Sequence, residues 1–388
     1  MENEFRGTIE SAVINGEVTL TVGEEGLTAV SLFDTADFPY ADITAIAFAD
    51  WAAHIQTDDG PVTVSRLGLA GEPFYQKLYQ AYNKKVLKAL FAEGAPLLET
   101  VGEYRIEENT NVIAGLTRNL STAISGRAVI QVFENCVCIL PPDENARRIP
   151  LCFLSGMDQS DWQLTLSLDT GETYHLIRLG YDTTPMARCI AEQLKKLREK
   201  TIDMVKAIDP ALTPAQASAL AKLLPEGAAA PLGQLAAIAP TFADALRAKL
   251  AESRAGESFE VFNEICDPAE ICVGLGQQLW LIGPGRNGRT AAVEFDVAEG
   301  ESAATFLYQF DGDVPLFTKQ LNRALEAIAF KREVIRLTPD ELRLPQYGNY
   351  KMAVRRNASL QFIRSCFVGR VIHATPESWR RNIENQLL

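Results

Sequence analysis

The 388-residue sequence lacks most of the features that mark common enzyme and membrane-protein classes. It has only three histidines, and it contains no Walker loop, nucleophile elbow, zinc-helix motif or EF-hand loop. No apolar run approaches the roughly 18 residues that a transmembrane helix needs. The acidic start, Met1–Arg6, has no apolar segment typical of a secretory signal. We therefore expect a non-enzymatic protein that uses no cofactor.

The seven cysteines are few and odd in number, and most lie inside apolar runs. Without a secretory signal, this usage indicates reduced, buried thiols and a cytoplasmic protein. Cys136 and Cys138 are two residues apart, so their thiols share one face of a strand. A metal site would need further ligands, but His54, His175 and His373 are all distant in sequence. We expect core cysteines and no bound metal.

Charge is unevenly distributed along the chain, whose net charge is −13. Residues 331–388 contain 11 Lys and Arg against 5 Asp and Glu, a net charge of +6, so the first 330 residues carry −19. An acidic body of this size repels nucleic acid, and we expect no nucleic-acid partner.

An internal repeat is visible near residues 50–68 and 161–180. Asp50, Trp51, Asp58 and Gly60 recur as Asp161, Trp162, Asp169 and Gly171, shifted by 111, and Arg66-Leu67-Gly68 recur as Arg178-Leu179-Gly180, shifted by 112. Each copy predicts a strand, an Asp-x-Gly turn, a second strand and an amphipathic helix. The one-residue difference suggests a bulge. We expect Trp51 and Trp162 to be buried at equivalent positions between sheet and helix.

A third, fainter copy is arguable further along the chain. Gln278–Ile282, Ala291–Val297 and Ala304–Phe310 predict strands, Ala298–Gly300 a turn, and Pro315 the start of a helix. The tryptophan and the Arg-Leu-Gly segment are absent there. Both a third copy and an unrelated α+β unit stay open.

Several short antiparallel strands followed by one amphipathic helix resemble the pleckstrin-homology-like fold. The segments that carry the resemblance are Asp42–Ile46, Ile55–Gly60, Val62–Gly68 and the helix Phe74–Leu90, which look like the second half of bacterial pleckstrin-homology or GRAM-type domains. The resemblance covers residues 5–93 and 100–206, and more weakly 257–330. It implies an α+β bacterial protein of tandem antiparallel barrel or sandwich modules, each capped by a C-terminal helix.

Eukaryotic pleckstrin-homology domains that bind inositol phosphates carry clustered Lys and Arg between their first two strands. This sequence departs from that pattern, because the early turn of the first copy has Glu24-Glu25 and the second copy offers only Arg147-Arg148. Phosphoinositide binding by the first copy is therefore not expected.

Composition divides the chain into five expected parts. They are module 1 (1–94), module 2 (95–208), an Ala-rich helical spacer (209–255), a candidate module 3 (256–330) and a basic, β-rich extension with a final helix (331–388). The spacer has 16 alanines in 47 residues, and its helices are either packed on neighbours or available to a partner.

Residues Gly283–Gly288 match the letters of a dinucleotide-binding loop. That function needs a helix after the loop, but β-forming residues follow it. We expect a strand-connecting turn, with Arg286 and Arg289 as candidate anion or partner contacts.

The basic extension predicts a hairpin from Val334–Leu337 and Glu341–Leu344. Further strand-like runs are Lys351–Val354, Leu360–Ile363 and Val368–His373, and Thr375 is the expected N-cap of a final helix. Its cations, notably Arg355, Arg356, Arg380 and Arg381, either dock on the acidic body or form an exposed patch.

These observations favour a protein-interaction scaffold or adaptor with an unidentified protein partner. The alternative is a peripheral protein that binds anionic lipid through its basic extension.

Overall fold

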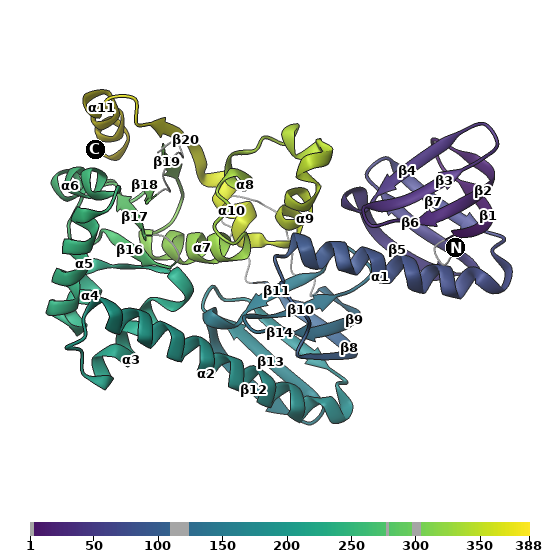
Figure 1. Ribbon diagram of the computed structural model, residues 1–388, viewed down its shortest axis with the longest axis horizontal. Helices are drawn as coiled ribbons and strands as arrows, with labels where there is room; N and C mark the ends of the chain where they lie inside the picture. The colour runs from purple at the N-terminus through teal and green to yellow at the C-terminus, as the bar shows by residue number, and fades with distance from the viewer. Residues whose placement is uncertain (1–3, 109–123, 277–278, 297–303) are drawn as a thin grey trace.

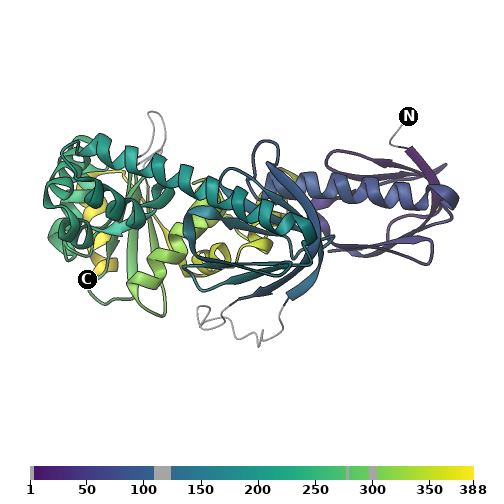
Figure 2. The same cartoon turned by 90° about the horizontal axis from the view of Figure 1, so that it is seen from below.

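The computed structural model describes residues 4–108, 124–276, 279–296 and 304–388. It is an α+β structure with three antiparallel sheets. We name residues 4–89 module 1, residues 98–208 module 2 and residues 209–388 the C-terminal domain. Figure 1 shows module 1 at one end, module 2 in the middle and most of the C-terminal domain at the other end. In Figure 2 the molecule is elongated along this axis.

Module 1 is one seven-stranded sheet followed by a helix. Its strands are β1 (Glu4–Glu10), β2 (Asn15–Val22), β3 (Gly26–Val30), β4 (Thr35–Pro39), β5 (Ile43–Ala49), β6 (Ala52–Thr57) and β7 (Gly60–Ser65), in the order β4-β3-β2-β1-β7-β6-β5. Helix α1 (Gly71–Ala89) follows. Phe74, Leu78 and Tyr82 recur every four residues along α1 and are fully buried, so one apolar stripe covers the sheet.

Module 2 repeats this arrangement. Its strands are β8 (Leu98–Glu107), β9 (Ile124–Val132), β10 (Cys136–Leu140), β11 (Arg147–Pro150), β12 (Leu154–Ser160), β13 (Gln163–Leu168) and β14 (Thr173–Ile177), in the order β11-β10-β9-β8-β14-β13-β12. Its helix, α2 (Thr183–Ile208), is longer than α1 and extends into the C-terminal domain, where Val205 is buried (Figure 2).

Backbone conformation supports the equivalence of the two copies. Arg66 and Arg178 both have left-handed φ, at 56° and 57°, as do Gly68 and Gly180, at 55° and 57°. The extra residue of module 2 lies in a turn, because Thr57 pairs with Gly60 whereas Ser167 pairs with Thr173. A longer turn, rather than the expected bulge, thus accounts for the change in the repeat offset from 111 to 112 residues.

The expected burial of the repeated tryptophans is wrong. Trp51 and Trp162 do occupy equivalent positions, in the β5–β6 and β12–β13 turns, with φ of 63° and 59°. Their exposed fractions are 77% and 54%. The Asp-Trp pair itself forms each turn, so the side chain leaves the sheet at its end instead of packing under the helix.

The C-terminal domain has one six-stranded sheet with helices on it. Its strands are β15 (Ala229–Pro231), β16 (Cys272–Leu275), β17 (Leu279–Pro284), β18 (Thr290–Phe295), β19 (Ala304–Gln309) and β20 (Phe367–Ile372), in consecutive order. Its helices are α3 (Pro214–Leu223), α4 (Leu232–Ile238), α5 (Pro240–Glu252), α6 (Gly256–Ile265), α7 (Val314–Ala327), α8 (Glu333–Arg336), α9 (Gly348–Arg356), α10 (Ala358–Cys366) and α11 (Pro376–Leu387).

This sheet corrects the expected division of residues 209–388. The candidate third module has a consecutive strand order that differs from that of modules 1 and 2. Strand β15 comes from the expected spacer and β20 from the expected extension, so all three parts share one sheet. The strand after Ala304 is present as β19, whereas the turn Ala298–Gly300 lies outside the described residues.

The expected β-rich extension is mostly helical. The run at 334–337 lies in α8 and its C-cap, the runs at 351–354 and 360–363 lie within α9 and α10, and 341–343 form a 3-10 turn. Apolar runs this short fit a strand or a buried helix equally well, and packing on the sheet decides between them. The strand near 368 and the final helix are confirmed, and Thr375 Oγ1 accepts a hydrogen bond from the N–H of Ser378.

All seven cysteines are free thiols, and Cys136 and Cys138 are fully buried with their sulfurs 4.0 Å apart. Within the described ranges, no helix combines the length and apolar character needed to cross a membrane.

Candidate functional site

The outer edge of β5 in module 1 is occupied by the β10–β11 loop of module 2. The N–H of Ile46 donates to the carbonyl of Pro142 at 2.7 Å, and the N–H of Glu144 donates to the carbonyl of Thr44 at 2.9 Å. The Tyr79 hydroxyl on α1 donates to the carbonyl of Leu140 at 2.5 Å. Module 1 therefore holds this loop on the edge of β5 through an antiparallel bridge at Ala45 and Asp143, beside its helix.

Apolar side chains continue the module 1 core through this contact. Phe133, Cys136 and Leu140 of module 2 and Met352 of α9 belong to the same buried cluster as the core of module 1. Burial of apolar surface across such a contact stabilises it, so the two modules and α9 are packed as one body.

The edge of β12 in module 2 is built like that of β5. The pairing of β5 with β6 shifts register around Thr44, and the pairing of β12 with β13 shifts register around Ser155. The side chains at the two register shifts make equivalent hydrogen bonds. Thr44 Oγ1 donates to the carbonyl of Gln56 at 3.4 Å, and Ser155 Oγ donates to the carbonyl of Ser167 at 3.2 Å.

One difference separates the two edges. In the sheet formed by the described residues, β12 is the terminal strand, and no segment of that part of the chain pairs with its outer side. We call Ser155–Met157 the β12 edge. It has the backbone geometry with which module 1 holds a segment, and it is the candidate binding site.

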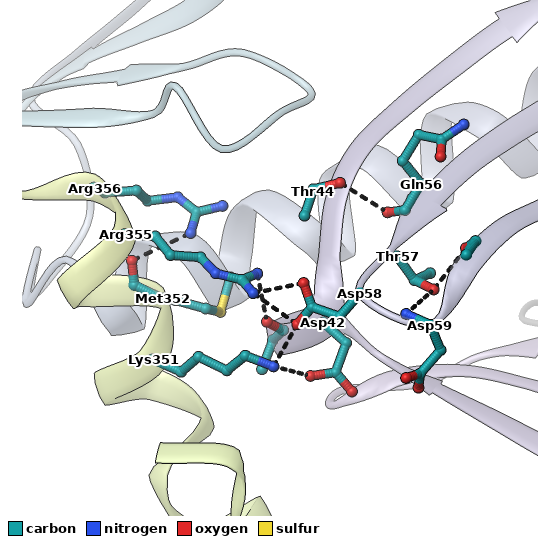
Figure 3. A network of polar contacts seen from close by, with 12 residues as sticks. Asp42, Thr44, Gln56, Thr57, Asp58, Asp59, Lys351, Met352, Arg355 and Arg356 are labelled. Carbon is teal, nitrogen blue, oxygen red and sulfur yellow. Dashed lines mark hydrogen bonds and ion pairs between the residues drawn. The ribbon is translucent and has the colours of Figure 1, made fainter. Parts of the chain in front are cut away.

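A cluster of ion pairs joins α9 to module 1 on the side shown in Figure 3. Lys351 Nζ lies 2.5 Å from Asp42 Oδ1 and 2.6 Å from Asp58 Oδ2. Arg355 donates to both carboxylate oxygens of Asp58 at 2.6 Å. Burial alone raises the pKa of Asp58, but the hydrogen bonds from Lys351 and Arg355 outweigh it and hold the pKa below its ordinary value. Arg355 is thus docked on the acidic body.

Arg356 is buried rather than exposed. Its guanidinium donates to the Tyr82 hydroxyl at 2.5 Å and to the carbonyl of Met352 at 3.2 Å, and it lies 5.9 Å from the Tyr82 ring centroid. Its Nε has no hydrogen-bond partner in the described part of the chain. Burial lowers the pKa of Arg356, as expected for a cation held mainly by neutral groups.

The C-terminal domain also contacts module 2 through charges. Arg148 on β11 forms a buried ion pair with Glu326 on α7, and Arg323 donates to the carbonyl of Arg148 at 2.9 Å. Desolvation raises the pKa of Asp169, while the charges of Lys319 and Arg323 on α7 oppose that rise.

The other predicted contact residues lie elsewhere and do not gather into one patch. The turn expected at Gly283–Gly288 connects β17 to β18 at Gly285–Arg289, because Gly283 and Pro284 still pair with β18. Arg286 Nε donates to the carbonyl of Ile265 at 2.9 Å. Arg289 is exposed in this turn. Arg380 on α11 pairs with Glu264 and, at 2.8 Å, with Glu384, and Arg381 beside it is exposed.

The turns compared with inositol-phosphate sites carry paired charges. Glu24 and Glu25 join β2 to β3, not the first two strands, and pair with Lys88 and Lys85 of α1. The β1–β2 connection, residues 11–14, has no charged residue.

A pocket of about 570 Å³ lies between the end of α1 and the start of α9. Lys88 in its wall pairs with Glu24, Lys331 lies 5.2 Å from the Phe91 ring centroid, and Tyr347 stacks on Tyr350. These contacts engage part of the wall, while Asn349 Oδ1 in the same wall has no hydrogen-bond partner in the described part of the chain.

Within the described ranges, no group of three or more His, Cys, Asp or Glu side chains is arranged to bind a metal. His373 Nε2 lies 3.1 Å from the buried Glu294, but Thr305 hydrogen-bonds to that carboxylate and Trp379 Nε1 donates to Thr305 at 2.8 Å. This network is satisfied by its own members and holds α11 on the sheet.

Sequence reasoning missed the two strand edges, because bulges and pairing between distant segments have no compositional mark. The only local sign was Pro141-Pro142, which ends β10 and leaves the following residues available to another edge. A scan against protein-family models finds no match, and no curated protein is detectably similar in sequence, so the geometry of these edges carries the functional argument.

Proposed function

We propose that this chain is a non-enzymatic cytoplasmic scaffold of two pleckstrin-homology-like modules that binds protein partners at the β12 edge. The observation that carries the proposal is the pair of equivalent edges. Module 1 holds Pro142–Glu144 along β5, and module 2 presents the same bulged strand with its outer side open in the described structure.

The pleckstrin-homology-like assignment draws support from topology. Modules 1 and 2 both have seven antiparallel strands in the same spatial order, and each is followed by a C-terminal helix. The seven free thiols support a reducing compartment.

An edge strand offers a row of N–H and C=O groups that favours pairing with another chain. Main-chain hydrogen bonds to such an edge supply affinity, and the side chains beside it supply specificity. The partner segment therefore has to present main-chain groups to the edge, as Pro142 and Glu144 do on β5.

Anionic-lipid binding, the alternative, draws less support. Lys351, Arg355 and Arg380 are paired with carboxylates, and Arg364 donates to backbone carbonyls that include Leu337 at 2.5 Å. A vesicle surface would have to displace these contacts or rely on the few exposed arginines.

The test is selection of short random peptides on the full-length chain, followed by hydrogen-exchange mapping of the bound site. Binders should protect the β12 edge from exchange. Met157→Pro removes the N–H equivalent to that of Ile46 and should lose binding at least tenfold. Met157→Leu keeps that N–H and the apolar volume, and it should bind normally.

Two results would overturn the proposal. One is a set of binders that protects other strands and ignores Met157→Pro in a folded variant. The other is the absence of peptide binders together with binding to vesicles containing phosphatidylserine but not to neutral vesicles, which would favour the lipid alternative.

A further inference from the structure

We infer that copies of this chain join head to tail, with the β3–β4 loop of one copy seated on the β12 edge of another. This inference rests on the proposed function and names a second copy as a partner. It extends the contact already made between module 2 and module 1 within the chain.

The donor surface exists in both modules. The β3–β4 loop, Ser31–Asp34, is the counterpart of the β10–β11 loop, because Gly26 pairs with Pro39 as Cys136 pairs with Pro150. The module 2 loop is covered by module 1. The apolar side chains of the module 1 loop are open, since Leu32 and Phe33 are each 92% exposed. Val30, the counterpart of the buried Leu140, is 42% exposed.

Two adjacent, almost fully exposed apolar side chains are a costly feature unless a partner covers them. The loop holds them in a fixed conformation, because Ser31 Oγ accepts hydrogen bonds from the N–H groups of Phe33 and Asp34. A preformed loop loses little conformational entropy when it binds.

The acceptor surface differs between the modules in a complementary way. Beside β5, α1 presents Tyr75 and Tyr79, which stack with ring centroids 6.1 Å apart, and the Tyr79 hydroxyl donates to the carbonyl of Leu140 at the start of the β10–β11 loop. At the corresponding positions of α2, Ala187 is buried and Ala191 is exposed. The surface beside β12 thus lacks the large aromatic side chains found beside β5, which leaves room there for Leu32 and Phe33.

This contact would be heterologous, since each copy has one donor loop and one acceptor edge on different modules. Heterologous contacts propagate into open chains or close into rings, and they do not stop at symmetric dimers. We expect the 42.6 kDa chain to form a concentration-dependent series of species.

The experiment is sedimentation velocity on the full-length chain over a range of concentrations. A loop variant, Leu32→Ser with Phe33→Ser, and an edge variant, Met157→Pro, should each sediment as monomers. Leu69→Ser removes an equally exposed apolar side chain outside the loop and should associate like the parent chain. Ala191→Glu gives a second edge variant that leaves the sheet backbone unchanged, in case Met157→Pro does not fold.

Mixing distinguishes this contact from any other. The loop variant keeps an intact edge and the edge variant keeps an intact loop, so an equimolar mixture should form dimers and nothing larger. A parent chain that is monomeric at all concentrations, a blocked variant that still associates, or a mixture that stays monomeric would each overturn the inference.

Failure here and failure of the proposed function give different results. If peptides bind the β12 edge while the parent chain stays monomeric, only the second-copy partner is wrong. The loop variant should retain peptide binding in either case, because its own β12 edge is untouched.

Discussion

Asp58 and Asp169 occupy the same turn of the two modules, but only Asp58 forms ion pairs with the C-terminal domain among the described residues. Lys351 and Arg355, four residues apart on α9, both pair with Asp58. Asp169 is mainly desolvated, which raises its pKa, and the charges of Lys319 and Arg323 on α7 only oppose that rise. The repeated aspartate of module 1 is therefore a point at which the C-terminal domain engages that module. Around Asp58, the acidic body and the basic extension are docked.

Reversing the charge of Arg355 should weaken the contact between α9 and module 1. Arg355→Glu replaces two hydrogen bonds to Asp58 with repulsion, and we expect a loss of about 1–2 kcal/mol in the free energy of unfolding. Denaturant unfolding measures this. Arg343→Glu is the matched control, because Arg343 is exposed and pairs only with its neighbour Asp340 among the described residues. Equal effects of the two variants would contradict the docked arrangement.

The same contact should depend on pH in one direction. The folded-state pKa of Asp58 lies below its ordinary value of 3.8, so its stabilising contribution is complete above that value and is lost as pH falls through the lowered pKa. The stability difference between the parent chain and Asp58→Asn should be constant between roughly pH 7 and pH 5 and shrink toward pH 3. Thermal unfolding at each pH measures it, and a difference that grows on acidification would be inconsistent with this sign.

Buried Arg356 should be replaceable by an apolar side chain of similar length. Its partners are neutral groups, and removing a buried charge avoids the cost of desolvation. We expect Arg356→Met to unfold within about 1 kcal/mol of the parent chain, and Arg356→Glu to lose roughly 3 kcal/mol or more. Denaturant unfolding compares the two variants. A methionine variant as unstable as the glutamate variant would show that the guanidinium itself holds the contact.

Trp51 should be dispensable for stability. Asp50 and Trp51 both have positive φ, at 52° and 63°, a conformation that favours Asn-Gly in a two-residue hairpin turn. Trp51→Gly relieves this strain, so stability should be unchanged or higher by up to about 1 kcal/mol. Trp280→Ala is the contrast, because Trp280 is fully buried and its loss should cost roughly 3–5 kcal/mol. A Trp51 variant that loses several kcal/mol would restore a structural role for this side chain.

The repeat could be predicted from sequence because its turns need special residues. Gly60, Gly68 and Gly180 have positive φ, and because glycine is the residue that adopts this conformation most readily, such positions can be recognised in the sequence. The strands between them followed from the alternation of apolar and polar side chains. Burial of the tryptophans did not follow, because a large aromatic in a turn looks the same in sequence as one in a core.

Packing between distant segments decided the remaining features. Helices α8–α10 are short, and their apolar runs gain a conformation only from the sheet and the module they cover. Asp58, which pairs with Arg355, is 297 residues away in the chain, and the residues that bond to the β5 edge lie in module 2. Such contacts have no local signature, so the candidate site became visible only in the structure.

Amide hydrogen exchange at Ile46 and Met157 tests the central claim most directly. In the dilute monomer, the N–H of Ile46 should be protected by its bond to Pro142, while the equivalent N–H of Met157 should exchange freely. On binding a selected peptide or a second copy, Met157 should become protected to a similar degree. Strong protection of Met157 in the dilute monomer, or free exchange of Met157 in a partner-bound state, would contradict the account.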